Sequence, residues 1–327
     1  MTPQIPTENG PRVKARLTAL VTGGAGFIGS HLVDRLLEAG YRVVCVDNFV
    51  LGRREHLQKA AEHADFLLEE LDLLDLPGLD RLFSSETLDI VFHLAANSDI
   101  REGTKSTDRD LQLTFMTTYN VLECMRRHGI RRLFFTSTPA IFGEHDEALH
   151  EHTSVRPESL YGASKLSAEA FIMAFSGLYD MQAWICRLSN IVGERSTHGI
   201  ILDLLEKLTS NTSELEVLGD GTQTKPYMYV HEIVEAFMFI IAHSDDRLNI
   251  FNIGPRDTTT VAEIAEIVLE LAGDGQRIAY TGGDRGWKGD VPLYSYQPSK
   301  LEALGWPPPM TSTQAVRTAV TRIIEGR

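Results

Sequence analysis

A glycine-rich turn between a strand-like and a helix-like segment constrains this chain more than any other feature. The apolar run TALVTG leads directly into TGGAGFIG at residues 22–29, and helical periodicity follows. In such a turn Gly23 permits the tight bend, Gly26 lets backbone N–H groups approach a pyrophosphate, and Gly29 allows the helix to pack closely on the strand. The segment therefore predicts a dinucleotide-binding turn.

An acidic residue after the second strand-like segment bears on the choice of cofactor. Asp47 ends RVVCVD, eighteen residues past Gly29, where its carboxylate can accept hydrogen bonds from both ribose hydroxyls and would repel a 2′-phosphate. This favours NAD over NADP, although a guanidinium of Arg53 or Arg54 could partly accommodate a 2′-phosphate. Asp72, after the third strand, is a candidate for the adenine edge, with a helix N-cap as the alternative. The same segments predict further cofactor contacts at Phe27, Ile28, Asn48 and Leu73.

Strand-like and helix-like segments alternate through the first part of the chain. TALVTG, RVVCVD, DIVFHLAA and RLFFTST are continuous apolar runs, which indicates strands buried on both faces. The alternation predicts an α/β fold with a Rossmann-type, doubly wound parallel sheet. After AWICRLSN, longer helical segments and loops predict a smaller α+β lobe. We therefore expect a loose tail at 1–16, a Rossmann domain at 17–189 with 228–253 packed back on it, and a substrate-binding lobe mainly at 190–327.

Charge and composition exclude several classes of protein. The formal net charge of −14 opposes binding to nucleic acid or anionic lipid. No apolar run is long enough to cross a membrane, and the first sixteen residues lack the apolar core of a secretory signal. Cys45, Cys124 and Cys186 lie far apart in apolar segments, as expected for reduced thiols. The sequence predicts a soluble, cytoplasmic protein without nucleic-acid or membrane partners.

A second motif carries the predicted chemistry. The pentad from Tyr161 to Lys165 places a phenol and an ammonium four residues apart, on one face of a helix. A free phenol, with a pKa of about 10, is a poor base at neutral pH. We expect the ammonium and the positive nicotinamide ring to lower the pKa of Tyr161 toward the working range. Upstream, the strand end FTST predicts that the Thr138 hydroxyl bridges the reacting hydroxyl and the phenol.

Taken together, the motifs resemble one family. TGGAGFIG, VDNF, HLAA, STPAIFG, YGASK, RLSNIVG, LGDGTQ, FNIG and SKLEALGW are similar to segments of the extended short-chain dehydrogenase/reductases that modify nucleotide sugars. The likeness begins at about residue 17, covers nearly the whole chain, and is nearest to the UDP-glucose 4-epimerase-like branch. It implies an NAD-dependent enzyme acting on a nucleotide diphosphate sugar.

The resemblance also implies roles for individual residues. Tyr161 would act as base and acid, Lys165 would also hold the nicotinamide ribose, and Thr138 would be the hydroxyl partner. Asn190, in RLSNIVG, would contact the substrate diphosphate. Backbone groups of the HLAA segment would line the cofactor at Ala95 and Ala96.

The residues after Thr138 narrow the reaction. In the dehydratases that this chain resembles, the catalytic threonine is followed by Asp-Glu, and the related decarboxylases retain the Glu, whereas this chain has Pro139 and Ala140. What remains is a base, a hydroxyl relay, a cation and NAD, the minimum set for reversible hydride transfer. Our hypothesis is that Tyr161 removes the proton of the C4 hydroxyl of a UDP-hexose or UDP-hexuronate as hydride passes to NAD⁺. The 4-keto sugar then turns over, and hydride returns to its opposite face.

Three alternatives stay open. The enzyme could epimerise another carbon, or it could be another nucleotide-sugar oxidoreductase or a dehydratase. A remote alternative is a non-catalytic NAD-binding regulator, which would have no need for a base, a cation and a hydroxyl together.

Two segments depart from the family pattern. Where relatives show an Arg-Asp pair before an aromatic segment, this chain has Lys225, a point charge without the bidentate fork of arginine. The segment from Asp284 to Asp290 replaces an expected Arg-Pro-Gly-Asp, and Arg285 or Lys288 is the candidate phosphate contact there, with a solvated loop as the alternative. Trp287 could stack on a nucleobase or anchor the loop.

We expect no metal site and a homodimer. His145, His150 and His152 crowd an acidic loop without helical ligand spacing, and His231 precedes Glu232 without an HExxH pattern. Amphipathic helices at about 108–128 and 160–178 correspond to the pair that forms a four-helix bundle between subunits in the family resembled.

Overall fold

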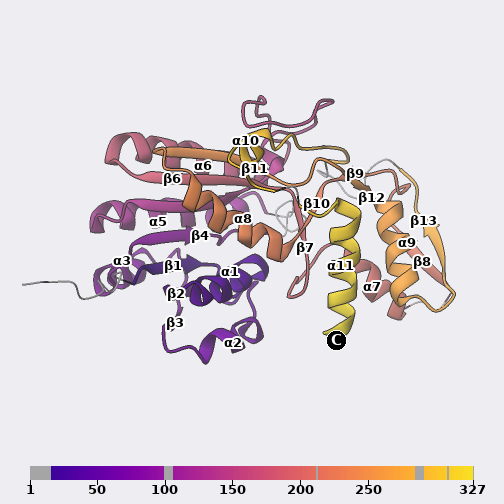
Figure 1. Ribbon diagram of the computed structural model, residues 1–327, viewed down its shortest axis with the longest axis horizontal. Coiled ribbons are helices and arrows are strands. Elements are labelled where there is room, and N and C mark those ends of the chain that lie inside the picture. The colour runs from indigo at the N-terminus through magenta and orange to yellow at the C-terminus, as the bar shows by residue number, and fades with distance from the viewer. Residues whose placement is uncertain (1–15, 99–105, 211–212, 284–290, 308, 327) are drawn as a thin grey trace, which may run out of the picture.

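The computed structural model describes residues 16–98, 106–210, 213–283, 291–307 and 309–326. Its centre is a seven-stranded parallel sheet (Figure 1). In spatial order the strands are β11 (Leu248–Ile253), β6 (Gln182–Leu188), β5 (Arg132–Ser137), β4 (Ile90–His93), β1 (Thr18–Thr22), β2 (Arg42–Asp47) and β3 (Phe66–Glu70). The strand order reverses direction between β1 and β4, and ligands of such sheets bind beyond the carboxyl ends of the strands at that point.

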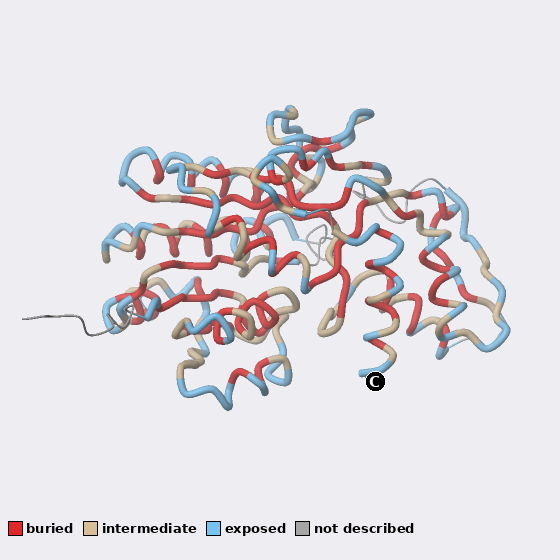
Figure 2. The backbone as a smooth tube through the Cα atoms, in the orientation of Figure 1, coloured by how far each residue is buried: buried red, intermediate tan, exposed pale blue. Residues whose placement is uncertain are grey.

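Helices cover both faces of this sheet, and successive strand residues supply the two faces in turn. Ala19 and Val21 of β1 share a core with α1 (Phe27–Glu38) and α8 (Val230–His243), whereas Leu20 faces the opposite core. That second core contains α3 (Leu76–Ser85), α5 (Thr117–His128) and α6 (Leu160–Tyr179). Figure 2 shows the strands buried between these layers. The predicted Rossmann-type α/β fold is confirmed.

Side-chain caps determine where two of these helices begin. The Ser159 hydroxyl accepts a hydrogen bond from the Gly162 amide at 3.0 Å, so α6 starts one residue before Tyr161. Asp75 caps α3 by accepting from the Gly78 amide at 3.1 Å. The alternative role of Asp72 as a helix N-cap is therefore wrong, because Asp75 occupies that position.

Shorter elements complete the first half of the molecule. They are the 3₁₀ helix η1 (Arg54–Leu57), α2 (Gln58–Ala61), the π-helical turn η2 (Leu111–Met116) that runs into α5, and the 3₁₀ helix η3 (Pro139–Ile141). Among the described residues, no helix combines the length and the apolar character needed to span a bilayer.

A second group of elements lies beyond the sheet, at the right of the view in Figure 1. Its helices are α7 (Ile200–Ser210), α9 (Val261–Ala272) and α11 (Ser312–Glu325), whereas α10 (Ser299–Ala303) packs on β11 of the sheet. Its strands form three small pairs: β7 (Asn190–Val192) with β10 (Tyr227–Tyr229), β9 (Thr224–Lys225) with β12 (Thr259–Thr260), and β8 (Glu214–Val217) with β13 (Arg277–Tyr280). Capping boxes at Thr260 and Thr311 start α9 and α11.

The chain passes between the two groups more than once. After β7, α7 and β10 it returns, so that α8 packs on α1 and β11 pairs with β6 along its whole length. It then leaves the sheet again for β12 and α9. Segments from both groups can therefore border one cavity.

Candidate active site

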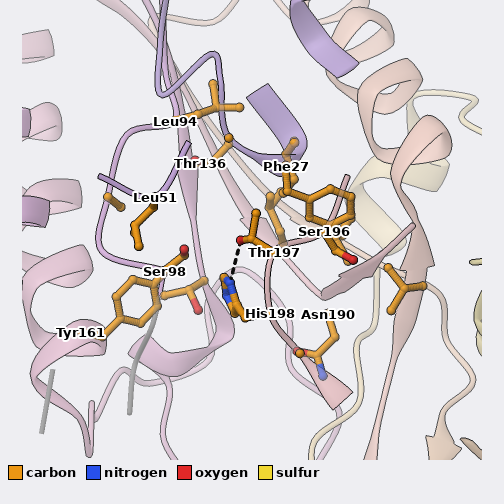
Figure 3. Close-up of a pocket in the computed structure, with 18 of the residues that line it drawn as sticks. Phe27, Leu51, Leu94, Ser98, Thr136, Tyr161, Asn190, Ser196, Thr197 and His198 are labelled. Carbon is orange, nitrogen blue, oxygen red and sulfur yellow. Dashed lines mark hydrogen bonds between the residues drawn. The ribbon is translucent and has the colours of Figure 1, made fainter. Parts of the chain in front are cut away.

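A cavity of about 840 Å³ lies where the carboxyl ends of the sheet strands meet the second group of elements (Figure 3). In Figure 3, Phe27, Tyr161 and Asn190 come from separate elements and border the same space. Its volume is within the range of small-molecule and cofactor sites. The cavity is lined by every predicted site residue that the structure describes: Gly23, Gly26, Phe27, Ile28, Gly29, Asp47, Asn48, Asp72, Leu73, Ala95, Ala96, Thr138, Tyr161, Lys165, Asn190 and Lys225. Arg285, Trp287 and Lys288 lie outside the described residues.

The glycine turn is built so tightly that side chains are excluded from it. Gly23 has a φ of +69°, and a Cβ there would lie 2.8 Å from the Ala95 backbone nitrogen. A Cβ on Gly29 would lie 2.1 Å from the Gly23 carbonyl oxygen. Helix α1 begins after Gly26 without a side-chain cap, so its first amides remain available at the edge of the cavity.

Asp47 is held in place by backbone amides at the end of β2. Its two carboxylate oxygens accept hydrogen bonds from the amides of Ala25, at 2.9 Å, and Phe49, at 2.8 Å. Burial raises the pKa of this carboxyl, and those amide hydrogen bonds oppose the rise. Arg54 is paired with Glu70 and lies over the Phe49 ring, 4.0 Å from its centroid.

Neither Arg53 nor Arg54 lines the cavity. A 2′-phosphate beside Asp47 would therefore meet a carboxylate without a guanidinium in the cavity wall. Asp72 also lines the cavity, and its carboxylate accepts hydrogen bonds from the side-chain amide of Asn48, at 3.2 Å, and from the backbone amide of Leu74, at 2.8 Å. This places Asp72 at the cavity edge as an acceptor.

The candidates for catalysis are Thr138, Tyr161 and Lys165, and they lie together where β5 meets α6. We call these three residues the catalytic edge of the cavity. Lys165 is buried, its Nζ donates to the Thr136 carbonyl at 2.7 Å, and it lies 4.5 Å from the centroid of the Phe135 ring. Thr138 forms a side-chain hydrogen bond with the Tyr161 phenol. The Thr138 hydroxyl also accepts from the Ala140 amide at 3.2 Å, which fixes its orientation at the start of η3.

One half of an electrostatic prediction for Tyr161, the effect of the Lys165 ammonium, is not seen in the structure, and the other half, the effect of a bound nicotinamide ring, stays a prediction. Burial raises the pKa of Tyr161 to about 12, and the opposing effect of the Thr138 hydrogen bond is smaller. The Lys165 ammonium points to the Thr136 carbonyl, so it does not lower the pKa of the phenol as the pentad spacing suggested. Burial lowers the pKa of Lys165 itself to about 7. The protein alone therefore keeps the phenol protonated and places the titration of Lys165 near neutrality.

Asn190 and Lys225 lie on the wall formed by the second group of elements. Asn190 starts β7 and accepts a hydrogen bond from the Tyr294 hydroxyl at 3.3 Å. Lys225 lies on β9, next to the turn into β10, whose Tyr227 is paired with Asn190. The structure thus brings together two polar residues that are 35 positions apart in the sequence.

The sequence analysis missed several residues of this wall. The segment Ser196–Gly199 lines the cavity, and the Thr197 hydroxyl is 3.1 Å from the His198 Nδ1 (Figure 3). Lys207 and Glu216 also line it and form an ion pair of 2.9 Å between α7 and β8. The position of RLSNIVG at a strand end was the signal that could have indicated the first segment, since loops follow such ends into the site. The ion pair of Lys207 and Glu216 has no comparable sequence signal, because it depends on how α7 packs on β8.

A cluster of two histidines and a glutamate anchors the segment before Ser196. His231 Nε2 lies 2.8 Å from a Glu194 carboxylate oxygen, and the Tyr229 hydroxyl donates to the other oxygen at 3.0 Å. His31, on α1, lies 3.1 Å from the Glu194 carbonyl oxygen through its Nε2. These ligand-type atoms lie within 4.8 Å of one another, and each has a hydrogen-bond partner. The cluster ties the cavity wall to α1 and α8.

Comparisons with known proteins agree with this geometry. The model of the NAD dependent epimerase/dehydratase family matches residues 19–254. The chain is 29% identical to the UDP-glucose 4-epimerase of Corynebacterium glutamicum over 91% of this chain and 92% of that protein. Among solved structures, a UDP-galactose 4-epimerase is 35% identical, with a TM-score of 0.84 over 95% of this chain and 99% of that one. The Thermus thermophilus UDP-glucose 4-epimerase in complex with NAD is 29% identical, with a TM-score of 0.85 over 95% of this chain and 100% of that one.

Proposed function

The chain belongs to the NAD dependent epimerase/dehydratase family, and on that premise we propose that it inverts C4 of a UDP-hexose or UDP-hexuronate. It is an NAD-dependent nucleotide-sugar epimerase, like the three relatives named above. The observation that carries the proposal is the placement of Tyr161, Lys165 and Thr138 in the same cavity as the glycine turn and Asp47.

The residues of the turn fit NAD. A Cβ at Gly23 or Gly29 would collide with backbone, so the turn requires glycine there, and the uncapped start of α1 borders the cavity where a pyrophosphate could approach it. The Asp47 carboxylate, held by two amides, faces the place where adenosine ribose hydroxyls would bind. When bound, NAD supplies a reversible two-electron acceptor for a sugar carbon and a positive charge close to the catalytic edge.

The residues of the catalytic edge would move the proton. We expect the positive charge of bound NAD⁺ to lower the pKa of Tyr161 from its raised value, so that the phenolate forms. The Tyr161 phenolate would then take the proton of the C4 hydroxyl as that carbon is oxidised to a ketone, and the phenol would give the proton back when the carbon is reduced from its other face. The Thr138 hydroxyl, hydrogen-bonded to the phenol, holds the sugar oxygen in line with it. Lys165, whose Nζ lies 2.7 Å from the Thr136 carbonyl oxygen, would hold the nicotinamide ribose. Pro139 and Ala140 line the cavity without a titratable group, so the dehydration step that needs a neighbouring acid has no partner there.

The substrate would span the two groups of elements. Asn190 and Lys225 lie where a diphosphate can meet an amide and an ammonium, and Arg285 and Lys288 stay predictions for the same role. Asn190 is held by Tyr294, which limits its rotation. Lys225 supplies a single positive charge rather than a planar fork.

Product analysis and one substitution test this function. The purified protein with NAD should convert a UDP-sugar from a panel into its 4-epimer, with the C4 hydrogen retained in deuterated buffer, as read by NMR. Tyr161→Phe should lower kcat by about 10³-fold, because the phenol proton transfer is lost, while NAD still binds. Solvent deuterium at C5, a deoxy product or stoichiometric consumption of NAD(P)H would contradict C4 epimerisation. A Tyr161→Phe variant with unchanged turnover would contradict the role of the phenol.

We also propose that the protein is a homodimer. Apolar side chains on the outer side of the η2–α5 and α6 pair are exposed: Leu111 is 46% exposed, Phe171 40%, and Leu178 74%. Phe115 and Phe171 pack edge to face with centroids 4.9 Å apart, which makes the two helices one surface. A bundle with the same pair of a second copy would bury this surface. Light scattering should give twice the chain mass, and Leu178→Glu should halve it.

For its location we propose the cytoplasm. Cys45, Cys124 and Cys186 are free and buried, which suits a reducing compartment. Fractionation of the cells that express the protein would check this.

A further inference from the structure

Three successive residues at the end of β5 are bonded to three residues spaced by four on α6. The Thr138 side chain meets Tyr161, the Thr136 carbonyl meets Lys165, and the Ser137 hydroxyl meets Glu169. The first two contacts belong to the catalytic edge described above. The third lies one helical turn deeper, and the proposed reaction does not use it.

Glu169 is fully buried, and its carboxylate has more than one hydrogen-bond partner. Its carboxylate accepts from the Ser137 hydroxyl at 2.5 Å and from Arg187 at 2.7 Å and 3.1 Å. Ser137 and Arg187 face each other across the β5–β6 pair, so one carboxylate on α6 spans two adjacent strand ends. A buried carboxylate is retained at such a place only when its hydrogen bonds are satisfied, and both of its oxygens have partners here.

Arg187 extends this connection to the loop before Tyr161. Its Nη1 donates to the Glu151 carbonyl at 3.0 Å, and the Glu151 carboxylate accepts from the Asn252 amide of β11 at 2.9 Å. The Glu169–Arg187 ion pair therefore links α6 to the ends of β5, β6 and β11.

Several charged or titratable groups lie around Lys165. Glu169 and Tyr161 are on its own helix, His93 ends β4, and Arg187 approaches from β6. Asp110, at the start of η2, acts on the phenol rather than on the ammonium. His93 is neutral, since burial lowers its pKa to about 3, so Glu169 is the negative charge that supports the Lys165 ammonium.

We propose that Glu169 is a positioning residue for the catalytic edge: its carboxylate, paired with Arg187, docks the β5 end on α6 and keeps Lys165 charged. The proposal rests on the proposed function, because it assigns Glu169 a role in turnover through Lys165. Glu169 does not line the cavity, so its effect on the substrate is indirect.

The test is the titration of Lys165 followed by ¹³C NMR of the full chain labelled at lysine Cε, with Lys165→Arg used for assignment. In Glu169→Gln the pKa of Lys165 should fall by about one unit or more, because a negative charge is lost in a buried site. The alkaline limb of the kcat profile should then move to lower pH by a similar amount, since the ammonium is lost earlier. KM for the nucleotide sugar should stay within about twofold. Glu169→Asp, which keeps the charge, should restore the pKa.

Controls separate this role from general stability. Glu86→Gln makes the same change at a partly buried ion pair with Arg42, at the start of β2 and away from the cavity, and should leave both the titration and the profile unchanged. If Glu169→Gln does not fold, Glu169→Gln with Arg187→Gln removes both buried charges and should show a smaller fall in the pKa of Lys165, because the loss of the Arg187 positive charge partly offsets the loss of the carboxylate. A folded variant with an unchanged Lys165 titration would overturn the proposal. Absence of epimerase activity in the wild type would instead refute the proposed function and leave the titration as an independent test.

Discussion

Two regions of the cavity are built in different ways: the cofactor end, which comprises the glycine turn and Asp47, and the catalytic edge. The glycine turn and the Asp47 region rely on backbone: amides of Ala25 and Phe49, and glycines whose missing side chains create the space. The catalytic edge relies on buried side chains that hold one another, from Thr138 and Tyr161 down to Glu169 and Arg187. Backbone sites depend on local sequence, whereas side-chain networks depend on packing between distant segments. The two ends should therefore respond differently to substitution.

The largest effect on NAD affinity and on stability should come from adding a side chain to the glycine turn. Gly29→Ala places a Cβ 2.1 Å from the Gly23 carbonyl oxygen, so the turn must open. We expect NAD affinity to fall by several hundredfold, and stability by about 3 kcal/mol or more, as for an overpacked core. Isothermal titration and thermal unfolding measure the two. Gly177→Ala on α6, where a Cβ meets open space, is the matched control and should stabilise slightly. Equal NAD affinity in Gly29→Ala and Gly177→Ala would contradict the view that the cofactor end depends on the space left by its glycines.

The second largest effect should be a loss of turnover at the catalytic edge, without a change in NAD binding. Thr138→Val removes the hydroxyl that meets the phenol and should lower kcat by about 100-fold, because the sugar oxygen loses its alignment. The NAD dissociation constant should not change, since Thr138 belongs to the side-chain network. Thr138→Ser keeps the hydroxyl and should retain most of the activity. A parallel loss of NAD binding in Thr138→Val would show that the two ends are not independent.

A smaller effect is expected where a side chain completes the backbone site. Asp47→Asn keeps the shape but removes the charge that would repel a 2′-phosphate. NAD affinity should fall by about tenfold, and the preference for NAD over NADP should narrow. Competition binding with the two cofactors measures both. Asp72→Asn, at the adenine side of the cavity, should weaken both cofactors equally.

The smallest effect concerns stability in acid. His93 is buried between Thr22 and Thr118, with ring nitrogens 2.7 Å and 3.0 Å from their hydroxyls, and burial lowers its pKa to about 3. The unfolded chain binds this proton near pH 6.5, so the contribution of His93 to stability is lost as pH falls from about 6.5 toward 3. The loss at pH 5 is roughly 2 kcal/mol, or a few degrees in Tm. The acid limb, which is the fall of the free energy of unfolding as the pH decreases, should be less steep in His93→Gln, as measured by unfolding curves recorded from pH 7 to pH 4.5. Because burial lowers the pKa of His31 to about 4, part of the limb should remain.

The same contrast explains what could be predicted from sequence. The turn at 22–29, Asp47 and the strand pattern are local signals, so the Rossmann-type fold and the residues that line the proposed cofactor end of the cavity could be predicted from the sequence. The pentad spacing likewise indicated that Tyr161 and Lys165 share a helix face. Their protonation could not be read from spacing, because it depends on burial and on the Thr136 carbonyl that takes the ammonium.

Apart from the segment 196–199, which follows the strand end RLSNIVG, the residues missed by the sequence analysis have no local signature. Glu169 lies eight residues after Tyr161, and its importance depends on Arg187 of another strand. Lys207 reaches the cavity because α7 follows a loop anchored by Glu194. Such partners are determined by tertiary packing, so periodicity and motif spacing carry no information about them.

The late arrival of β11 has a consequence for how the protein is made. The edge strand that completes the sheet beside β6 comes from residues 248–253, after α7 and β10 have been synthesised. A nascent chain that stops before this point leaves the backbone groups of β6 exposed, which invites pairing with other chains. The sheet of the first half therefore lacks its edge strand until residues 248–253 have been synthesised, and at that point the cavity still lacks the later segments of its second wall.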